Sequence, residues 1–116
     1  MVVGIAERHD TDRLFHALAD ATRRDIVERT IQAEYSVSAL ARLYPMSFAA
    51  VQKHVGVLAD AHLVTKRRHG RQQLVSGNVD ALRRASQVLD AYEELWRSRM
   101  RRFGEILAED PEGASG

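Results

Sequence analysis

The stretch that decides the fold runs from Ser36 to Val75 and reads SVSALARLYPMSFAAVQKHVGVLADAHLVTKRRHGRQQLV. Its pattern predicts a helix, a tight turn, a second helix and a basic hairpin, in that order. Six Lys/Arg side chains stand against one acid, so the stretch carries +5, whereas the whole chain of 116 residues carries +1. Phosphate contacts supply the sequence-independent part of DNA affinity, so a positive middle between acidic flanks favours a nucleic-acid-binding protein.

The two helices of this stretch have clear start and stop signals. Ser36 is expected to cap a helix that Pro45 must end, because the residue before a proline is pushed out of the helical region. Ser47 is expected to cap a second helix that runs to about Ala61. A helix-turn-helix also needs apolar residues where its helices touch, and the sequence supplies Leu40, Tyr44, Met46 and Val51, with the small Ala41 at the crossing.

Pro45 stands where the turn of this motif commonly has glycine. Proline cannot adopt a positive φ, so the turn is expected to follow a different backbone path. After the second helix, residues 63–68 and 71–76 read as two short strands around a turn at His69-Gly70.

The second helix is predicted to expose one face. Val51, Val55 and Leu58 define the buried side, and the N-terminal half of the opposite side presents Ser47, Phe48, Ala49, Gln52 and Lys53. Gln52 can pair with adenine, Lys53 can reach guanine or phosphate, and Phe48 or Ala49 can touch a thymine methyl group. The alternative is that Gln52 and Lys53 are ordinary solvated surface. His54 is expected to be a partly buried, hydrogen-bonded histidine rather than a base reader.

The hairpin concentrates positive charge. The candidate DNA contacts are Lys66, Arg67, Arg68, His69 and Arg71, of which Arg68 and Arg71 flank the tip and are assigned to phosphate or minor-groove contacts. Charged edge strands also prevent aggregation, which is the alternative reason for cations here. Four cations without an acid between them exceed that need.

The remainder of the chain is predicted to be helical. A first helix spans residues 10–19, and Asp20 caps a second over 21–31 with Ile26, Val27 and Ile31 facing inward. Residues 32–35 form a connection. A long helix spans residues 79–109, and residues 110–116 form a disordered tail.

The long helix carries one continuous apolar stripe from Leu82 to Leu107. The alternative is that it packs wholly on its own domain, but a helix of about 30 residues is about 45 Å long, more than the other helices can cover. The stripe therefore predicts a dimer surface. The long helix is expected to contribute Leu89, Tyr92, Leu95, Trp96 and Phe103, and the first helix is expected to contribute Phe15 and Leu18.

Composition narrows the function classes. The length supports a single domain, placed at residues 1–109, and 45% apolar with 28% charged residues is typical of a globular protein. No apolar run is long enough for a membrane span and no signal peptide is evident, so a cytoplasmic location is expected. No nucleotide-binding, hydrolase or metalloprotease motif is present, so the protein is not expected to be an enzyme.

These motifs together resemble the ArsR family of winged helix-turn-helix transcriptional regulators. LADATRRDIV (residues 18–27) is similar to a signature of that family at the second helix, with Ala21 in place of proline, and the block from Ser36 to Val64 is similar to its helix-turn-helix. The resemblance implies a mainly α winged helix with a small β-hairpin wing and a long C-terminal dimerisation helix. It also implies a homodimeric repressor that binds double-stranded operator DNA at an inverted repeat.

Members of this family often sense metals, but the resemblance supplies no such site here. The chain has no cysteine, and residues 79–109 contain no histidine. Asp12 and His16, four residues apart, are the remaining pair that could ligate a metal with help from a partner chain. We therefore expect no metal and no cofactor. The alternatives to a repressor are a DNA-binding protein regulated by a partner with no small-molecule effector, and a winged-helix module that binds other proteins.

Overall fold

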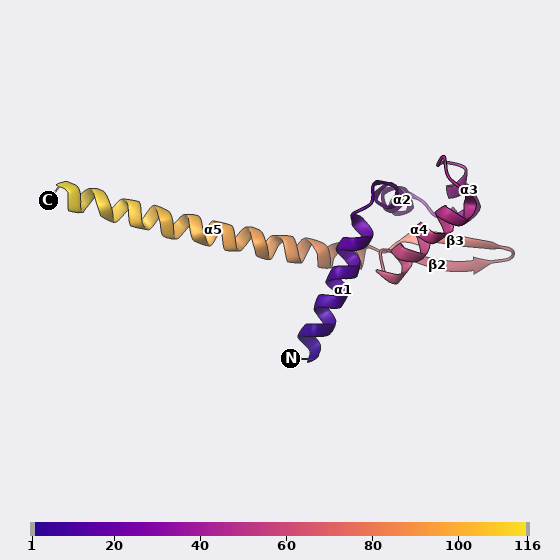
Figure 1. The fold of residues 1–116 in the computed structure, drawn as a ribbon, viewed down its shortest axis with the longest axis horizontal. Helices are drawn as coiled ribbons and strands as arrows, with labels where there is room; N and C mark the ends of the chain where they lie inside the picture. Colours follow the sequence, from indigo (N-terminus) through magenta and orange to yellow (C-terminus); the bar gives the residue numbers. More distant parts are fainter. Residues whose placement is uncertain (1, 116) are drawn as a thin grey trace. The chain divides into compact units, whose positions relative to one another are not determined.

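The computed structural model describes the backbone of residues 2–115 and the side chains of residues 8–109. Its elements are, in chain order, α1 (Val2–Leu18), α2 (Ala21–Gln32), β1 (Tyr35–Ser36), α3 (Val37–Ala41), α4 (Phe48–Asp60), β2 (Val64–His69), β3 (Gln72–Gly77) and α5 (Val79–Ser115) (Figure 1). The chain divides into two compact units, Met1–Ala85 and Ser86–Gly116.

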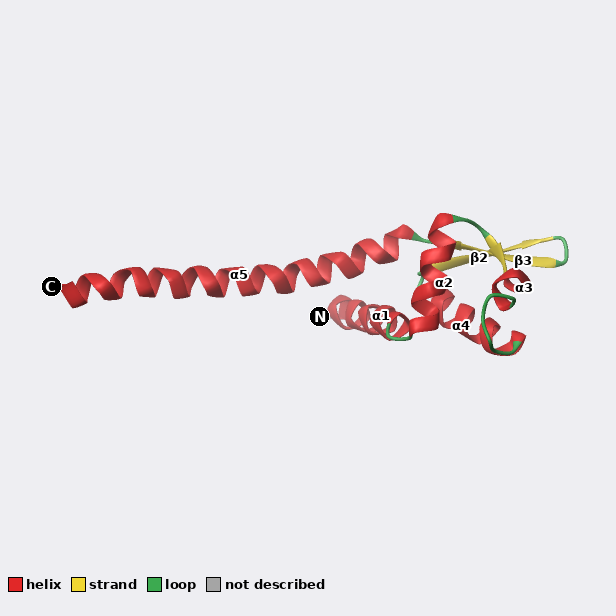
Figure 2. Ribbon diagram, turned by 90° about the horizontal axis from the view of Figure 1, so that it is seen from above, coloured by secondary structure: helices red, strands yellow, loops and turns green. Residues whose placement is uncertain are grey.

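The first unit is a winged helix-turn-helix. Its three strands form an antiparallel sheet in the order β1-β3-β2, and Figure 2 shows this sheet beside α2, α3 and α4. The core takes residues from every helix and from β2 and β3. Its largest fully buried side chains are Leu14, Ile26, Leu40, Val51, Val55, Leu58, Leu63 and Val75.

Within the second unit, residues 86–115 form a single stretch of helix, which has no core of its own among the described side chains. The expectation of one domain over residues 1–109 therefore stays a prediction. Helix α5 continues to Ser115, beyond the expected end at Glu109. The side chains of residues 110–116 lie outside the described residues, so the disordered tail expected there also stays a prediction.

The predicted helix starts of the first unit are confirmed by their caps. The Asp20 carboxylate accepts from the Arg23 backbone N–H at 2.9 Å, and the Ser36 hydroxyl accepts from Ala39 at 3.0 Å. Each cap satisfies an N–H group that has no partner within its helix. The first helix, by contrast, begins at Val2, well before the expected residue 10.

Two sequence expectations around α2 are wrong. Tyr35, assigned to a connection, forms β1 together with the helix cap Ser36, and this strand pairs Tyr35 with Val75 and Ser36 with Leu74. Ile31, expected to face inward, is 49% exposed. The buried residue of that turn is Thr30, whose hydroxyl donates to the Ile26 carbonyl at 2.8 Å and so needs no partner from outside the helix.

None of the helices in the described part of the chain combines the length and the apolar character that crossing a membrane requires.

Candidate nucleic-acid interface

The turn before α4 shows how Pro45 replaces glycine. The Met46 N–H donates to the Tyr44 carbonyl at 2.9 Å, which closes a three-residue turn with Pro45 at its centre. The inverse form of this turn has a central φ of about −75°, close to the value that the proline ring imposes. The Ser47 hydroxyl then accepts from the Ala50 N–H at 3.1 Å and starts α4.

Helix α4 separates into a buried and an exposed face. Val51, Val55 and Leu58 are at most 1% exposed, as the sequence predicts. The candidate DNA contacts of the helix are all exposed and lie in its first half or at its cap: Ser47, Phe48, Ala49, Gln52 and Lys53. Phe48 is 48% exposed, which is unusual for a large aromatic side chain and leaves its ring free for contact with a base.

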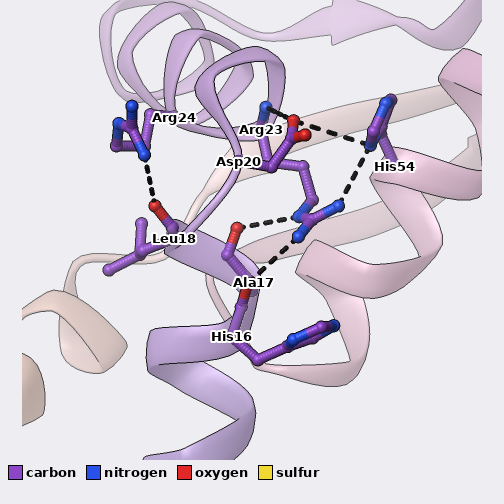
Figure 3. Close-up of polar contacts among 7 residues, drawn as sticks. All are labelled: His16, Ala17, Leu18, Asp20, Arg23, Arg24 and His54. Atoms are coloured by element: carbon purple, nitrogen blue, oxygen red, sulfur yellow. Dashed lines mark hydrogen bonds and ion pairs between the residues drawn. The ribbon is translucent and has the colours of Figure 1, made fainter.

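Arg23 of α2 connects its own helix with α1 and α4 (Figure 3). Its Nε donates to the Ala17 carbonyl at 2.8 Å and its Nη2 to the His16 carbonyl at 3.0 Å, so it satisfies the last turn of α1. Its Nη1 lies 3.3 Å from Nδ1 of His54 on α4. Since a guanidinium only donates, His54 accepts through Nδ1.

His54 is thus the partly buried, hydrogen-bonded histidine that the sequence predicts, with 22% of its side chain exposed. The Asp20 carboxylate lies 3.9 Å from the same ring nitrogen. The backbone N–H that Arg23 donates to this carboxylate, with a smaller contribution from the charge of the Arg23 guanidinium, lowers the pKa of Asp20. The cap of α2 is therefore ionised at neutral pH and lies beside α4.

A second polar cluster supports the turn between α3 and α4. The Tyr44 hydroxyl donates to Asp25 of α2, and the Arg29 Nε donates to the same carboxylate at 2.8 Å. The Tyr44 hydrogen bond, followed by that of Arg29, lowers the pKa of Asp25. Burial and the hydrogen bond to Asp25 raise the pKa of Tyr44 to about 12. The tyrosine therefore keeps its proton and ties the turn to α2.

The hairpin is in register around a two-residue turn. His69 pairs with Gln72, so Gly70 and Arg71 form the turn, one residue later than predicted. Gly70 has a φ of 63°, which a glycine adopts without steric cost. Arg71 consequently lies at the tip itself.

Strand alternation divides the basic side chains of the hairpin between its two faces. Lys66 pairs with Val75, and Arg68 shares its face with the buried Val64. Arg67 and His69 lie on the opposite face, where Arg67 forms an ion pair of 3.0 Å with Glu34. All five predicted hairpin contacts are exposed, but Arg67 already has an acidic partner.

Figures 1 and 2 both place the hairpin tip and the N-terminal end of α4 toward the same end of the first unit. The structure therefore brings the two groups of candidate DNA contacts together. The sequence analysis missed the residues that support them, namely Arg23 and the Tyr44–Asp25 pair. No local pattern marks these residues, because Arg23 meets His54 and Tyr44 meets Asp25 only in the fold.

The candidate dimer residues fall into two groups. Phe15 and Leu18 on α1 are half-buried and pack against the core of their own unit. Leu89, Tyr92, Leu95, Trp96 and Phe103 on α5 are 54 to 68% exposed.

The described residues contain no group of three His, Asp or Glu side chains placed to hold a metal ion. Asp12 and His16 are both exposed on α1, and the absence of a metal or cofactor in the working protein stays a prediction.

Comparison with known proteins places the chain among transcriptional regulators. The chain is 35% identical over 102 residues to the HTH-type transcriptional regulator Rv2034 of Mycobacterium tuberculosis, covering 88% of this chain and 91% of that protein. An ArsR-like transcriptional regulator from Rhodococcus sp. RHA1 has a similar structure, with a TM-score of 0.81 and 28% identity over 94% of this chain and 98% of that one.

A third relative is a winged helix-turn-helix DNA-binding domain from Mycobacterium bovis, described as homodimeric and as part of a possible ArsR-family regulator. It matches with a TM-score of 0.64 and 26% identity over 78% of this chain and 84% of that one. No family model matches the chain. The fold, the exposed α4 face beside a basic wing, and these relatives agree that the chain belongs to the ArsR family of winged helix-turn-helix transcriptional regulators.

Proposed function

We propose that the protein is a homodimeric repressor that binds an inverted-repeat operator through α4 and the wing. The observation that carries this proposal is the exposed first half of α4, which has Gln52 and Lys53 on its surface beside a hairpin with four cations. A recognition helix reads bases with its N-terminal residues in the major groove. The outer side chains of the same half of α4 are exposed here.

Each group of residues has a distinct role in this proposal. Gln52 reads a base edge, Lys53 contacts guanine or phosphate, and the exposed Phe48 and Ala49 contact a thymine methyl group. Ser47 lies at the helix N-terminus, where backbone N–H groups attract phosphate. The hairpin residues Lys66, Arg67, Arg68, His69 and Arg71 follow the backbone or enter the minor groove.

Arg68 and Arg71 carry most of the wing contribution. Neither forms an ion pair among the described residues, whereas Arg67 must first release Glu34. We therefore expect Arg67 to contribute less to DNA affinity than either of these two arginines.

The proposed dimer is supported by the large exposed side chains of α5, because a soluble protein rarely leaves such a face in water. The Mycobacterium bovis relative is homodimeric as well. A two-fold dimer presents two α4 helices, and its operator is then an inverted repeat with half-sites about one DNA turn apart. We place this activity in the cytoplasm, with the operator near the gene of the protein itself and without a metal or cofactor.

The test is fluorescence anisotropy with duplexes from the region upstream of the gene, compared with a scrambled duplex of equal length, at several salt concentrations. We expect tight, salt-sensitive binding to one upstream duplex. Arg68→Ala and Arg71→Ala should each weaken binding to both duplexes and reduce the salt slope by about one unit. Arg13→Ala, which removes an exposed arginine of α1, is the matched control and should change neither.

Equal affinity for the upstream and scrambled duplexes would contradict the proposal that the protein binds a specific operator upstream of its gene. An unchanged salt slope in both wing variants would remove the wing from the interface.

A further inference from the structure

The first turn of α4 has almost no side-chain group that can form a hydrogen bond with a base. Residues 47–50 read SFAA, so this turn contains neither an acid nor a cation. Its single polar side chain is that of Ser47, whose hydroxyl oxygen already accepts from the Ala50 N–H at 3.1 Å. Gln52 and Lys53, the polar residues of the exposed face, follow one turn later. The turn that a recognition helix places nearest the bases is therefore mainly apolar here.

Phe48 is the largest part of this apolar surface, and it contributes little to the fold itself. It is 48% exposed and belongs neither to the core nor to the half-buried residues around it. Apolar residues at a helix start often form a staple between the position before the cap and the fourth position of the helix. In α4 these positions are Met46, which packs against the core, and the buried Val51. Phe48 lies at neither position, and the neighbouring Ala49 is exposed as well.

The major groove offers one apolar group that matches such a surface. Base edges present nitrogen and oxygen donors and acceptors there, and thymine alone among the four bases adds a methyl group, at C5. Phenylalanine and alanine are among the side chains that contact this methyl group. Cytosine and uracil have a hydrogen atom at C5, whereas 5-methylcytosine has a methyl group at the same place as thymine. The first turn of α4 therefore fits a pyrimidine that is methylated at C5.

The surroundings of Phe48 favour DNA over another protein as its partner. The peptide dipoles give the N-terminus of α4 a partial positive charge, which attracts phosphate. Lys53 adds a full charge on the exposed side of the same helix. The basic hairpin tip lies toward the same end of the first unit (Figures 1 and 2). An aromatic ring among these positive charges is placed to meet a base whose phosphates they hold.

We propose that the first turn of α4 recognises the C5-methyl group of a pyrimidine through Phe48 and Ala49. The protein then binds a site that presents thymine or 5-methylcytosine at this position, and binds the same site more weakly when the methyl group is missing. This inference rests on the DNA binding of the proposed function and names the base feature that the first turn reads. It also makes binding sensitive to cytosine methylation.

The methyl contact and the contact of Gln52 are separable. Gln52 lies about 6 Å further along the helix axis than Phe48 and reads hydrogen-bonding groups of a base. Burial of one methyl group against Phe48 should change the affinity about fourfold. Loss of the Gln52 amide should leave that factor unchanged, because the amide does not touch the methyl group.

The experiment replaces thymine by deoxyuridine, which keeps every hydrogen-bonding group of the base and lacks only the methyl group. The probe is the upstream duplex that the protein binds most tightly, with its thymines replaced one at a time. Fluorescence anisotropy measures the affinity of the full wild-type chain, of Phe48→Ala and of Gln52→Ala as the matched control. Circular dichroism shows that each variant is folded. A scrambled duplex with and without deoxyuridine controls for general effects on DNA.

Wild-type protein should bind about fourfold more weakly for each contacted methyl group that is removed. Phe48→Ala should bind the thymine duplex more weakly and should not respond to deoxyuridine at those positions. Gln52→Ala should respond as the wild type does, and the scrambled duplex should show no effect. At a sensitive position, a 5-methylcytosine–guanine pair should bind wild-type protein about fourfold more tightly than a cytosine–guanine pair. This last comparison needs no variant.

Full affinity of the wild type for every deoxyuridine duplex would overturn the inference and leave specific DNA binding intact. Equal affinity for the methylated and unmethylated cytosine pairs would overturn it as well. A deoxyuridine effect that persists unchanged in Phe48→Ala would assign the methyl group to another side chain, against the proposal. Failure to find any duplex that binds more tightly than the scrambled one would overturn both the inference and the proposed function.

Discussion

Gln52 is the side chain on which sequence preference most depends in this account. It lies on the exposed side of α4 and can form two hydrogen bonds with one adenine. Gln52→Ala should cost about 1–3 kcal/mol on the best duplex and much less on a scrambled one. Gln32→Ala removes an exposed amide at the C-terminal end of α2, away from the proposed interface, and serves as the control. Equal losses on both duplexes would assign Gln52 to the DNA backbone.

Tyr44 affects stability through the charge of Asp25. Because the folded pKa of Asp25 is lowered, its contribution to stability is present above its unfolded pKa, about 3.9, and is lost as the pH falls through the lower folded value. Tyr44→Phe removes the largest cause of that shift. We expect it to lower the free energy of unfolding by about 1 kcal/mol at pH 7, with a smaller difference in acid.

Urea unfolding at several pH values measures this effect. The matched control is the same Tyr44→Phe change in an Asp25→Asn background, where no carboxylate titrates at this site and the penalty should not depend on pH. A Tyr44→Phe penalty that stays constant down to pH 2 would show that the hydroxyl does not act through the carboxylate.

Among the secondary-structure elements, those with caps or strong periodicity could be predicted from the sequence. The starts of α2, α3 and α4 and both wing strands were found because each has its own local signal. The two-residue strand β1 was missed, since so short a segment has no period and exists only because β3 offers it an edge. The prediction that Ile31 faces inward was wrong because this residue lies against Gly77 at the end of β3, outside the core.

The close contact between α2 and β3 depends on Gly77. A Cβ atom on Gly77 would lie 3.0 Å from the backbone N and Cα of Ile31, so the helix or the strand would have to move. Gly77→Ala should destabilise the protein by about 1–3 kcal/mol. Gly56 in α4 has no atom within 4 Å of the same position, so Gly56→Ala should stabilise it by about 0.5–1 kcal/mol.

Thermal unfolding monitored by circular dichroism compares the two alanine variants. Changes of the same sign in both would contradict the close approach of α2 to β3.

Across the chain, the exposure of the candidate DNA-contact residues could be predicted from the sequence, but the hydrogen-bond network behind them could not. The face of α4 follows from helical periodicity alone. The hydrogen bonds of Arg23 join α1, α2 and α4, and residues 31 positions apart in sequence meet only in the fold. Helical periodicity also predicts the apolar stripe on α5, but the sequence of one chain does not show what covers this stripe.

The central claim is that two copies of the chain read an inverted repeat through α4. The most direct measurement is selection of binding sites from a pool of random duplexes by the purified protein, followed by sequencing. We predict enrichment of an inverted repeat with half-site centres about 10 base pairs apart. The Gln52→Ala variant should lose its base preference at one position of each half-site. Enrichment of a single half-site, a direct repeat or no sequence at all would contradict the account.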